Sequence, residues 1–281
     1  MRIILTIIIV ICGKGLFAQF EVPAPGDVQK FFAGKTMILL EDNPMSEYNA
    51  MIKEAVPKIW KITPYGFCTR KDFDEIKNKS GVSVLSVEEF FFEKDKTGVR
   101  YNFLCLSLGD KTNKNETYFD LFHFPLSYVS DEEEEYMHSI PALLRIMQEF
   151  MLYIKENPKA TAADVRKNFF SGNTTLKDKT LYLSADDVET SMKTESRFKQ
   201  IYPYPFRFVS YEELQELMLN PKPQAVVLFK VGMGKGGKKA RCYKSVLGTD
   251  NGKIYYFDYH LINDNKPDAL LEEDVKKLAK P

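Results

Sequence analysis

The apolar positions of this chain follow two different periods, and the same succession of periods occurs twice. Between residues 46 and 60, apolar side chains recur every three or four residues, which is the spacing of an amphipathic helix. Shorter apolar runs on either side, at 36–40 and around 67, have the length of buried strands. Pro57 stands inside the predicted helix, and we expect it to kink or shorten the helix.

Extended over the whole chain, these periods predict one order of elements in two copies. The first copy reads helix 27–32, strand 36–40, helix 46–60, strand around 67, helix 72–77, and strands 82–92, 100–108 and 117–124. The second reads helix 161–170, strand 180–184, helix 186–201, strand around 208, helix 212–219, and strands 224–231, 241–247 and 253–260. Each copy is therefore β-α-β-α followed by an antiparallel meander of three strands.

Residue identities also support a tandem duplication. A shift of 141 positions brings 64–76 onto 205–217 and Arg100 onto Arg241. The same register pairs Cys105 with Val246 and Cys242 with Tyr101. The predicted fold is α/β (α+β), with two tandem duplicated domains at 19–130 and 158–281. In each domain we expect a mixed sheet with helices on one face.

Residues 131–157 connect the two copies and are not typical of a flexible linker, because they are not rich in Gly and Ser. An apolar stripe at helical spacing predicts a helix with a surface to cover. Its members are Leu143, Met147, Phe150, Met151 and Ile154. The stripe is interpreted as covering the junction between the copies, and the alternative is a helix that binds a partner in a groove.

This order of elements resembles the amino-terminal domain of TolB and the core of the curli-secretion lipoprotein family. The resemblance rests on element order within each copy and implies an exported envelope protein of Gram-negative bacteria, of the Bacteroidetes type.

The first residues, 1–18, are predicted to be a signal peptide cleaved after Ala18. Arg2 precedes an apolar run at 3–11, which is too short for a transmembrane helix. The alternatives are a buried N-terminal strand and a lipoprotein attached through Cys12. We expect the mature form to lack a transmembrane segment and to reside in the periplasm, at the outer membrane or outside the cell.

Loss of Arg2 and Lys14 with the signal peptide turns a formal charge of zero into a balance of about −2. A general nucleic-acid binder would carry a basic excess, so the composition argues against nucleic acid as a partner. A protein or an envelope polymer remains as the expected partner.

The most conspicuous motif is GMGKGGKK at 232–239. A phosphate-binding loop needs Ser or Thr after its lysine, and Lys239 takes that place. The duplication also aligns this stretch with the turn at 93–98. The motif is interpreted as a solvated turn, or as a basic contact of Lys235, Lys238 and Lys239 with lipid headgroups or polysaccharide.

Aromatic residues beside prolines form a second candidate contact. Tyr65, Tyr202 and Tyr204 could line a rim for sugar or peptide, or they could set the turn before a strand and pack inward. Cys68 and Cys105 align with apolar residues and should be buried, which leaves Cys242 as the possible reactive thiol. The histidines and acids predict no metal site, because the two copies differ in the spacing of Asp120–His123 and Asp258–His260.

No catalytic signature and no cofactor motif stands out. The sequence favours an exported, non-enzymatic envelope protein that acts as a binding or interaction module. The alternative is a hydrolase that acts on glycan or peptide where the two copies meet.

Overall fold

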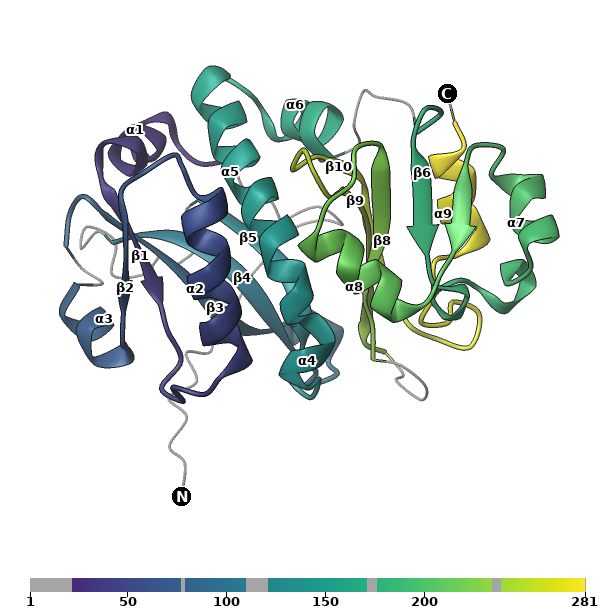
Figure 1. Ribbon diagram of the computed structural model, residues 1–281, viewed down its shortest axis with the longest axis horizontal. Coiled ribbons are helices and arrows are strands. Elements are labelled where there is room, and N and C mark those ends of the chain that lie inside the picture. The colour runs from purple at the N-terminus through teal and green to yellow at the C-terminus, as the bar shows by residue number, and fades with distance from the viewer. Residues whose placement is uncertain (1–21, 77–78, 110–120, 171–175, 234–238, 281) are drawn as a thin grey trace. The chain divides into compact units, whose positions relative to one another are not determined.

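The computed structural model describes residues 22–76, 79–109, 121–170, 176–233 and 239–280 (Figure 1). The chain divides into two compact units, Met1–Ala162 (unit 1) and Ala163–Pro281 (unit 2). The predicted signal peptide at 1–18 and the loop residues Lys235 and Lys238 lie outside the described residues.

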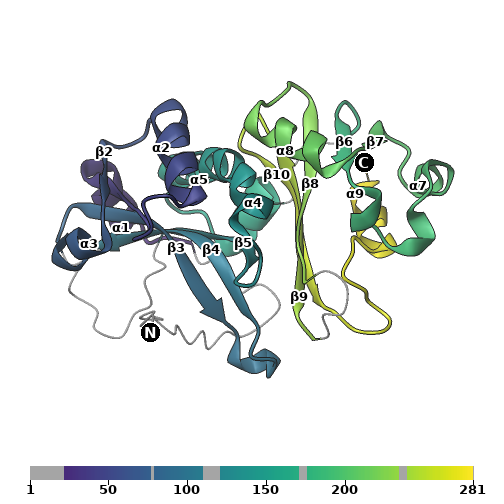
Figure 2. The same ribbon diagram turned by 60° about the horizontal axis from the view of Figure 1, so that its bottom comes forward.

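Within its described residues, unit 1 holds a five-stranded sheet in the order β2-β1-β3-β4-β5. The strands are β1 (Lys35–Leu39), β2 (Tyr65–Cys68), β3 (Val82–Phe91), β4 (Arg100–Gly109) and β5 (Phe122–Tyr128). β1 pairs in parallel with β2 and β3, and the later pairs are antiparallel. β3 and β4 extend past the rest of the sheet as a long hairpin (Figure 2).

Unit 2 repeats this topology in its described part, with the order β10-β9-β8-β6-β7. Its strands are β6 (Thr180–Leu183), β7 (Phe206–Phe208), β8 (Ala225–Val231), β9 (Arg241–Gly248) and β10 (Ile254–Leu261). The first strand again lies in the middle, with parallel neighbours on both sides, and the meander follows. The predicted mixed α/β fold with two similar halves is confirmed.

The residue register between the halves differs from the constant shift of 141. Thr36 pairs with Tyr65 and Ser83, and Leu181 pairs with Phe206 and Val226. Ser83 therefore corresponds to Val226, a shift of 143. The ladders of the next strands then match Cys105 with Ser245 and Cys242 with Asn102. The predicted partners Val246 and Tyr101 are wrong by one residue, because each loop changes the offset.

In unit 1 the first helices are α1 (Pro25–Ala33), α2 (Glu47–Ile59) and α3 (Arg70–Ile76). Ser46 caps α2 by accepting a hydrogen bond from the Asn49 amide, and Pro57 is accommodated in its last turn. The helix is thus not broken at the proline and ends two residues later.

Helices lie on both faces of the unit 1 sheet, so the prediction of helices on one face is wrong for this unit. Phe73 of α3 packs on Leu39 and Val84. The neighbouring residues Thr36 and Ser83 point to the opposite face, because side chains alternate along a strand. There the Thr36 hydroxyl meets that of Thr63 at 2.7 Å, and Thr63 accepts the Trp60 indole N–H at the end of α2. The crossover from β1 to β2 and the crossover from β2 to β3 run in opposite directions along the sheet, so right-handed connections place α2 and α3 on opposite faces.

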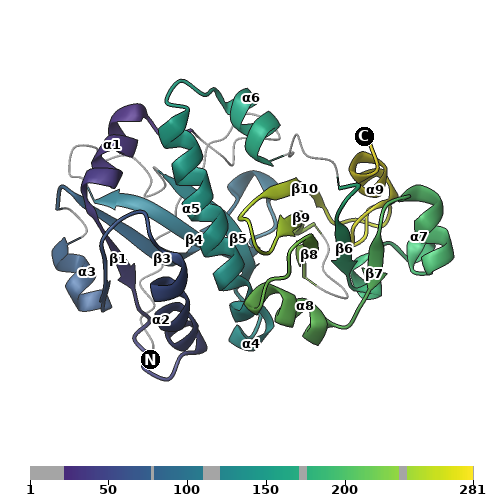
Figure 3. The ribbon, with the colours of Figure 1, turned by 45° about the horizontal axis from the view of Figure 1, so that its top comes forward.

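A helix after the last strand completes each unit. In unit 1, α4 (Glu133–Tyr136) leads through a 3-10 turn (Met137–Ser139) into α5 (Ile140–Glu156), which packs on α2, α1 and β5 (Figure 3). The apolar stripe predicted for this helix is buried, and within unit 1 it covers the α2 side. In unit 2, α9 (Glu272–Leu278) occupies the same place in the order and packs on α7 (Glu195–Ile201).

Three elements differ from their prediction. The helix expected at 186–201 is broken into 3-10 turns (Ala185–Asp187 and Thr190–Met192) before α7. The last strand of the first copy runs to Tyr128 rather than ending at 124, because a bulge at Leu126, opposite Asn102 and Phe103, lets Pro125 stay in this edge strand. No helix was predicted at α9.

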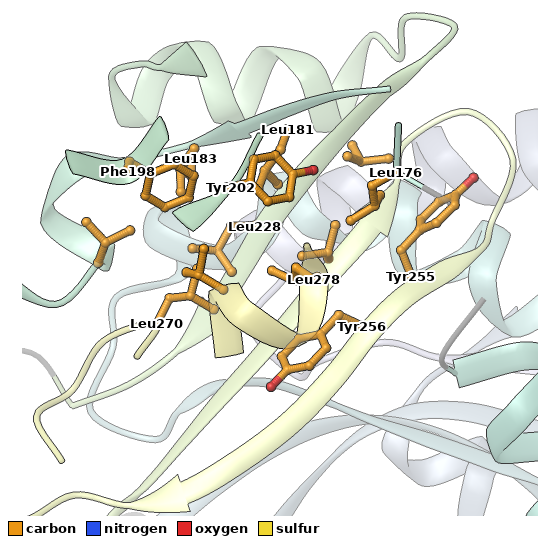
Figure 4. Packing of buried hydrophobic residues seen from close by; sticks show 14 of the residues in the cluster. Leu176, Leu181, Leu183, Phe198, Tyr202, Leu228, Tyr255, Tyr256, Leu270 and Leu278 are labelled. Carbon is orange, nitrogen blue, oxygen red and sulfur yellow. The ribbon is translucent and has the colours of Figure 1, made fainter. Parts of the chain in front are cut away.

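The remaining helices of unit 2 are α6 (Ala162–Val165), a π-helical turn (Arg166–Phe170) and α8 (Tyr211–Leu219). The core of unit 2 lies between the sheet and helices α7 and α9 (Figure 4). Leu181, Leu183, Val226 and Leu228 contribute from the central strands. The Phe170 ring contacts Phe257, which lies on the other face of this sheet.

Candidate functional site

The strand order of both units creates a topological switch point at the carboxyl end of the first strand. In open α/β sheets, ligands bind in the crevice at this point, because the helices on either side leave on opposite faces. In unit 1 the switch point is followed by Glu41 and Asp42, and in unit 2 by Asp186 and Asp187. The charged groups at these two places have different partners.

In unit 1 the β1–α2 loop is fixed by hydrogen bonds from Asn49 and Glu133. Asn49 exchanges two hydrogen bonds with the Glu41 main chain, at 2.9 and 3.0 Å. Glu133 of α4 reaches the start of α2, where one carboxylate oxygen accepts from the Ser46 hydroxyl and from the Tyr48 amide, both at 3.1 Å. A carboxylate is favourable there because the first amides of a helix carry partial positive charge.

Acidic groups outnumber cations at this switch point. Partial burial raises the pKa of Glu41, and the carboxyl group of Glu133 raises it further. Burial also raises the pKa of Glu88 on β3, although it accepts a hydrogen bond from Ser86 at 2.7 Å. Arg70, at the start of α3, is the cation that lowers both of these pKa values. The site thus favours a proton or another positive charge.

In unit 2 the corresponding acid is neutralised by a lysine of the same unit. The Lys230 ammonium on β8 lies 3.3 Å from both Asp187 and Asp268, and Asp187 also accepts from the Tyr211 hydroxyl at 3.0 Å. Burial opposes the charged form of Lys230, but the two carboxylates raise its pKa overall. The switch point of unit 2 is therefore closed by internal ion pairs.

Asp268 belongs to the connection between β10 and α9, residues 262–271, which we call the strap. Leu270 of the strap forms a parallel bridge with Val188 and donates its amide to the Asp187 carbonyl at 2.7 Å. This pairing explains why the helix expected from residue 186 is interrupted, since Val188 is extended there.

A second buried ion pair fixes α9 on the sheet. The Lys244 ammonium lies 2.5 Å from Asp274, which also accepts from the Tyr256 hydroxyl at 2.5 Å and the Leu271 amide at 2.9 Å. Burial tends to raise the pKa of Asp274, but Lys244 and these hydrogen bonds lower it overall. On the surface, Lys277 pairs with Asp258 at 2.7 Å.

Cys242 lies under the strap rather than at the surface. Its side chain is buried, and burial together with Asp268 raises its pKa well above the usual range. Such surroundings disfavour the thiolate that a nucleophile requires. Cys68 and Cys105 are also buried, as predicted.

The histidine opposite Cys242 on β10 is held by the strap. His260 Nε2 lies 2.8 Å from the Pro267 carbonyl oxygen, and burial lowers the pKa of the ring. Asp258 and His260 share a face of β10, as expected, whereas Asp120 falls outside the described residues. Among the residues that the structure describes, no three His, Cys, Asp or Glu side chains gather as metal ligands would.

The lysine and tyrosine candidates are dispersed. Lys239 is exposed, has φ of 63°, and donates its amide to the Ile262 carbonyl at 2.8 Å. Tyr65 is 36% exposed on edge strand β2. Tyr202 is buried beside Phe198, and Tyr204 is half-buried with its hydroxyl 3.2 Å from the Ala279 carbonyl oxygen. The contacts of Tyr202 and Tyr204 agree with the interpretation that these side chains pack inward and set the turn before a strand.

The residues that the sequence analysis passed over are the charged ones at the switch points. Lys230 interrupts the apolar run VVLFKVG, and Lys244 lies in the middle of the strand RCYKSVLG. A charge inside such a strand is rarely buried without a partner, so these positions were a usable indication. Glu41 and Glu133 gave no comparable indication, because they are 92 positions apart and surrounded by other acids.

No protein-family model, curated protein or solved structure matches this chain. The resemblance in element order to the TolB and curli-secretion domains therefore stays a prediction. Across the described residues, none of the helices combines the length and the apolar character needed to cross a membrane.

Proposed function

We propose that the protein is an exported, non-enzymatic binding module whose unit 1 takes up a positively charged segment of a partner protein at the carboxyl end of β1. The contrast between the two units carries this proposal. Unit 2 neutralises its acid with Lys230 at 3.3 Å, whereas unit 1 has Glu41, Glu88 and Glu133 around one arginine. Charge complementarity of this kind mainly sets partner choice and association rate.

The same charges argue against an anionic envelope polymer as the ligand of unit 1. Phosphate or carboxylate groups of such a polymer would meet like charges, which costs free energy at an interface. A basic peptide segment, in contrast, supplies the positive charge that the raised pKa values of Glu41 and Glu88 favour.

Binding of charged peptides to the mature chain tests this function. We expect a fluorescent lysine-rich peptide, followed by anisotropy at low salt, to bind more tightly than a glutamate-rich peptide of equal length. Replacing two acids at the switch point, Asp42→Asn with Glu88→Gln, should weaken binding of the lysine peptide about tenfold. Each exposed charge pair contributes about 0.7 kcal/mol, and about 1.4 kcal/mol is a factor of ten in affinity.

The matched control removes acids from exposed positions in unit 2, Asp250→Asn with Asp264→Asn, and should leave affinity unchanged. Equal weakening by both pairs of substitutions would reduce the effect to net charge and contradict the proposed site. Preferential binding of the glutamate-rich peptide or of an anionic polysaccharide would contradict the proposed partner class.

A hydrolase acting on glycan or peptide is the second candidate, favoured by one observation. The pKa of Glu41 is raised by burial and by the neighbouring carboxyl group of Glu133. A carboxyl group with a raised pKa is a group that general acid–base catalysis uses. Release of labelled fragments from peptidoglycan, abolished in Glu41→Gln, would favour this alternative over the binding module.

A further inference from the structure

The outer edge of β2 carries main-chain groups that pair with no other strand in the part of the chain that the structure describes. β2 is the last strand of the unit 1 sheet, next to β1 (Figure 1). The carbonyl oxygens of Pro64 and Cys68 accept hydrogen bonds from amides of the β1 segment, at 2.8 and 2.9 Å. Because these groups alternate in direction along a strand, the amides and carbonyls of Tyr65 and Phe67 point away from the sheet.

The two faces of β2 differ in chemistry. Tyr65 and Phe67 lie on one face, where their rings meet edge to face with centroids 6.1 Å apart. Gly66 lies on the other face, and the Lys35 ammonium is 3.0 Å from the position that a β-carbon would take there. Lys35 is exposed, and no carboxylate of the described residues pairs with it. The edge therefore combines an aromatic face with a face that carries an unpaired cation.

The charged residues at the two ends of β2 are mostly basic. Lys61 precedes the strand, Arg70 and Lys71 follow it, and all three are exposed. Asp72 is the acid of this stretch, and it accepts a hydrogen bond from the Thr69 hydroxyl at 2.8 Å. The edge is thus flanked by more positive than negative charge.

We propose that the outer edge of β2 binds an extended segment of a partner protein, which adds a strand to the unit 1 sheet and alternates acidic with apolar side chains. In strand addition, main-chain hydrogen bonds give affinity and the side chains on alternate positions give specificity. Successive side chains of a strand point to opposite faces. The acidic side chains of the added strand therefore face Lys35, and the apolar ones pack on Tyr65 and Phe67.

A second copy of this chain is a less suitable occupant of the edge. Two β2 strands paired across Gly66 would bring two Lys35 ammonium groups together, and like charges across strands are destabilising. Lysine at a sheet edge is a common means of preventing association between copies. The same lysine favours an acidic strand, so charge complementarity selects a different chain as the partner.

Unit 2 lacks this combination at its corresponding edge. The strand ladders place Arg207 of β7 where unit 1 has Gly66. The Arg207 guanidinium lies 5.7 Å from the centroid of the Tyr182 ring and 3.5 Å from the Glu213 carboxylate of the same unit. The cation at this edge already has an acidic partner. The inference therefore concerns unit 1 alone, and it rests on β2 and Lys35 rather than on the acidic switch point.

Binding of alternating peptides to the mature chain, followed by fluorescence anisotropy, tests this site. The probe is a labelled peptide of alternating glutamate and valine, about eight residues long, which is within the usual length of a strand. We expect it to bind more tightly than the same peptide with lysine in place of glutamate. N-methylation of either the glutamate amides or the valine amides removes the donors of one edge, and one of these two peptides should lose binding.

Lys35→Gln should weaken binding of the glutamate–valine peptide about threefold, since an exposed ion pair contributes less than about 1 kcal/mol. The matched control is Lys53→Gln, an exposed lysine of α2, which should leave affinity unchanged. In amide hydrogen exchange, the peptide should slow exchange at Tyr65 and Phe67 and leave the edge strand β7 of unit 2 unaffected.

Three outcomes would overturn the inference. The first is binding that survives both N-methylations, because strand addition needs one edge of the peptide. The second is equal affinity of Lys35→Gln and the wild type for the glutamate–valine peptide. The third is slow exchange at Tyr65 and Phe67 in concentrated protein without peptide, which would assign the edge to a second copy.

Discussion

Lys244 is a charged residue in the middle of a buried strand, and only 2% of its side chain is exposed. Such a residue is tolerated because Asp274 accepts a hydrogen bond from the Lys244 ammonium. Asp274 also accepts hydrogen bonds from the Tyr256 hydroxyl and the Leu271 amide. A buried pair of this kind adds little net stability over apolar residues, but a single missing partner leaves an uncompensated charge.

We therefore expect Lys244→Met to destabilise unit 2 by about 3–5 kcal/mol, because Asp274 stays buried without its cation. Urea unfolding followed by far-ultraviolet circular dichroism measures this loss. The double variant Lys244→Met with Asp274→Asn should recover at least half of it, since no charge is left unpaired. A single variant as stable as the wild type would show that Asp274 finds water or another cation.

His138, between α4 and α5, is the residue with the clearest pH effect in unit 1. Burial lowers its pKa from 6.5 to about 4. The unfolded chain then binds a proton that the folded chain does not, so this group removes stability as pH falls below 6.5. The loss between pH 7 and pH 5 is about 2 kcal/mol by the same linkage.

Replacing His138 with Gln should abolish this part of the pH dependence. Trp60 is the single tryptophan of the chain and is buried in unit 1, so its fluorescence during urea unfolding reports on this unit. The informative quantity is the difference between wild type and variant, because Glu41 and Glu47 change stability in the opposite direction. If the free energy of unfolding fell equally with falling pH in both proteins, His138 would not be a buried neutral histidine in the folded chain.

At the scale of elements, the strap decides the shape of unit 2. It bridges Val188, supplies Asp268 to Lys230 and leads into α9. Gly232, just after β8, makes room for it, because a methyl group at this position would collide with the Asp268 carboxylate. The glycine-rich motif thus begins with a packing requirement rather than with a phosphate site.

Gly232→Ala should consequently destabilise unit 2 by about 1–3 kcal/mol, the usual cost of overpacking. Circular dichroism during urea unfolding again provides the measurement. Gly26→Ala in α1 is the matched control, since a methyl group there meets nothing within 4 Å and alanine favours a helix. A Gly232 variant as stable as the control would mean that Asp268 moves away from Lys230 without cost.

Element prediction succeeded where the apolar pattern was local and failed where a distant segment intervened. α2 and its cap at Ser46 follow from residues 46–59 alone. Only the second half of the helix predicted at 186–201 forms. Leu270, 82 positions further along the chain, pairs with Val188 and keeps the first half from becoming helical. α9 was predictable, since Leu271, Val275 and Leu278 have helical spacing between an acidic first turn and a basic last turn.

At the scale of the whole molecule, the duplication is the main result. Both units place their first strand between two parallel neighbours and finish with an antiparallel meander and a helix. The halves have diverged at the carboxyl end of the first strand, where one uses Lys230 and the other keeps its acids. This divergence is the basis for assigning the proposed binding role to unit 1.

The sequence by itself determined the order of strands and helices and the repetition of that order, because both depend on periodicity within short segments. Only the tertiary structure decided the register between the halves and the groups that meet at each switch point. Loops change the offset between copies without changing strand order, and Glu41 meets Glu133, as Lys230 meets Asp268, only after distant segments have packed.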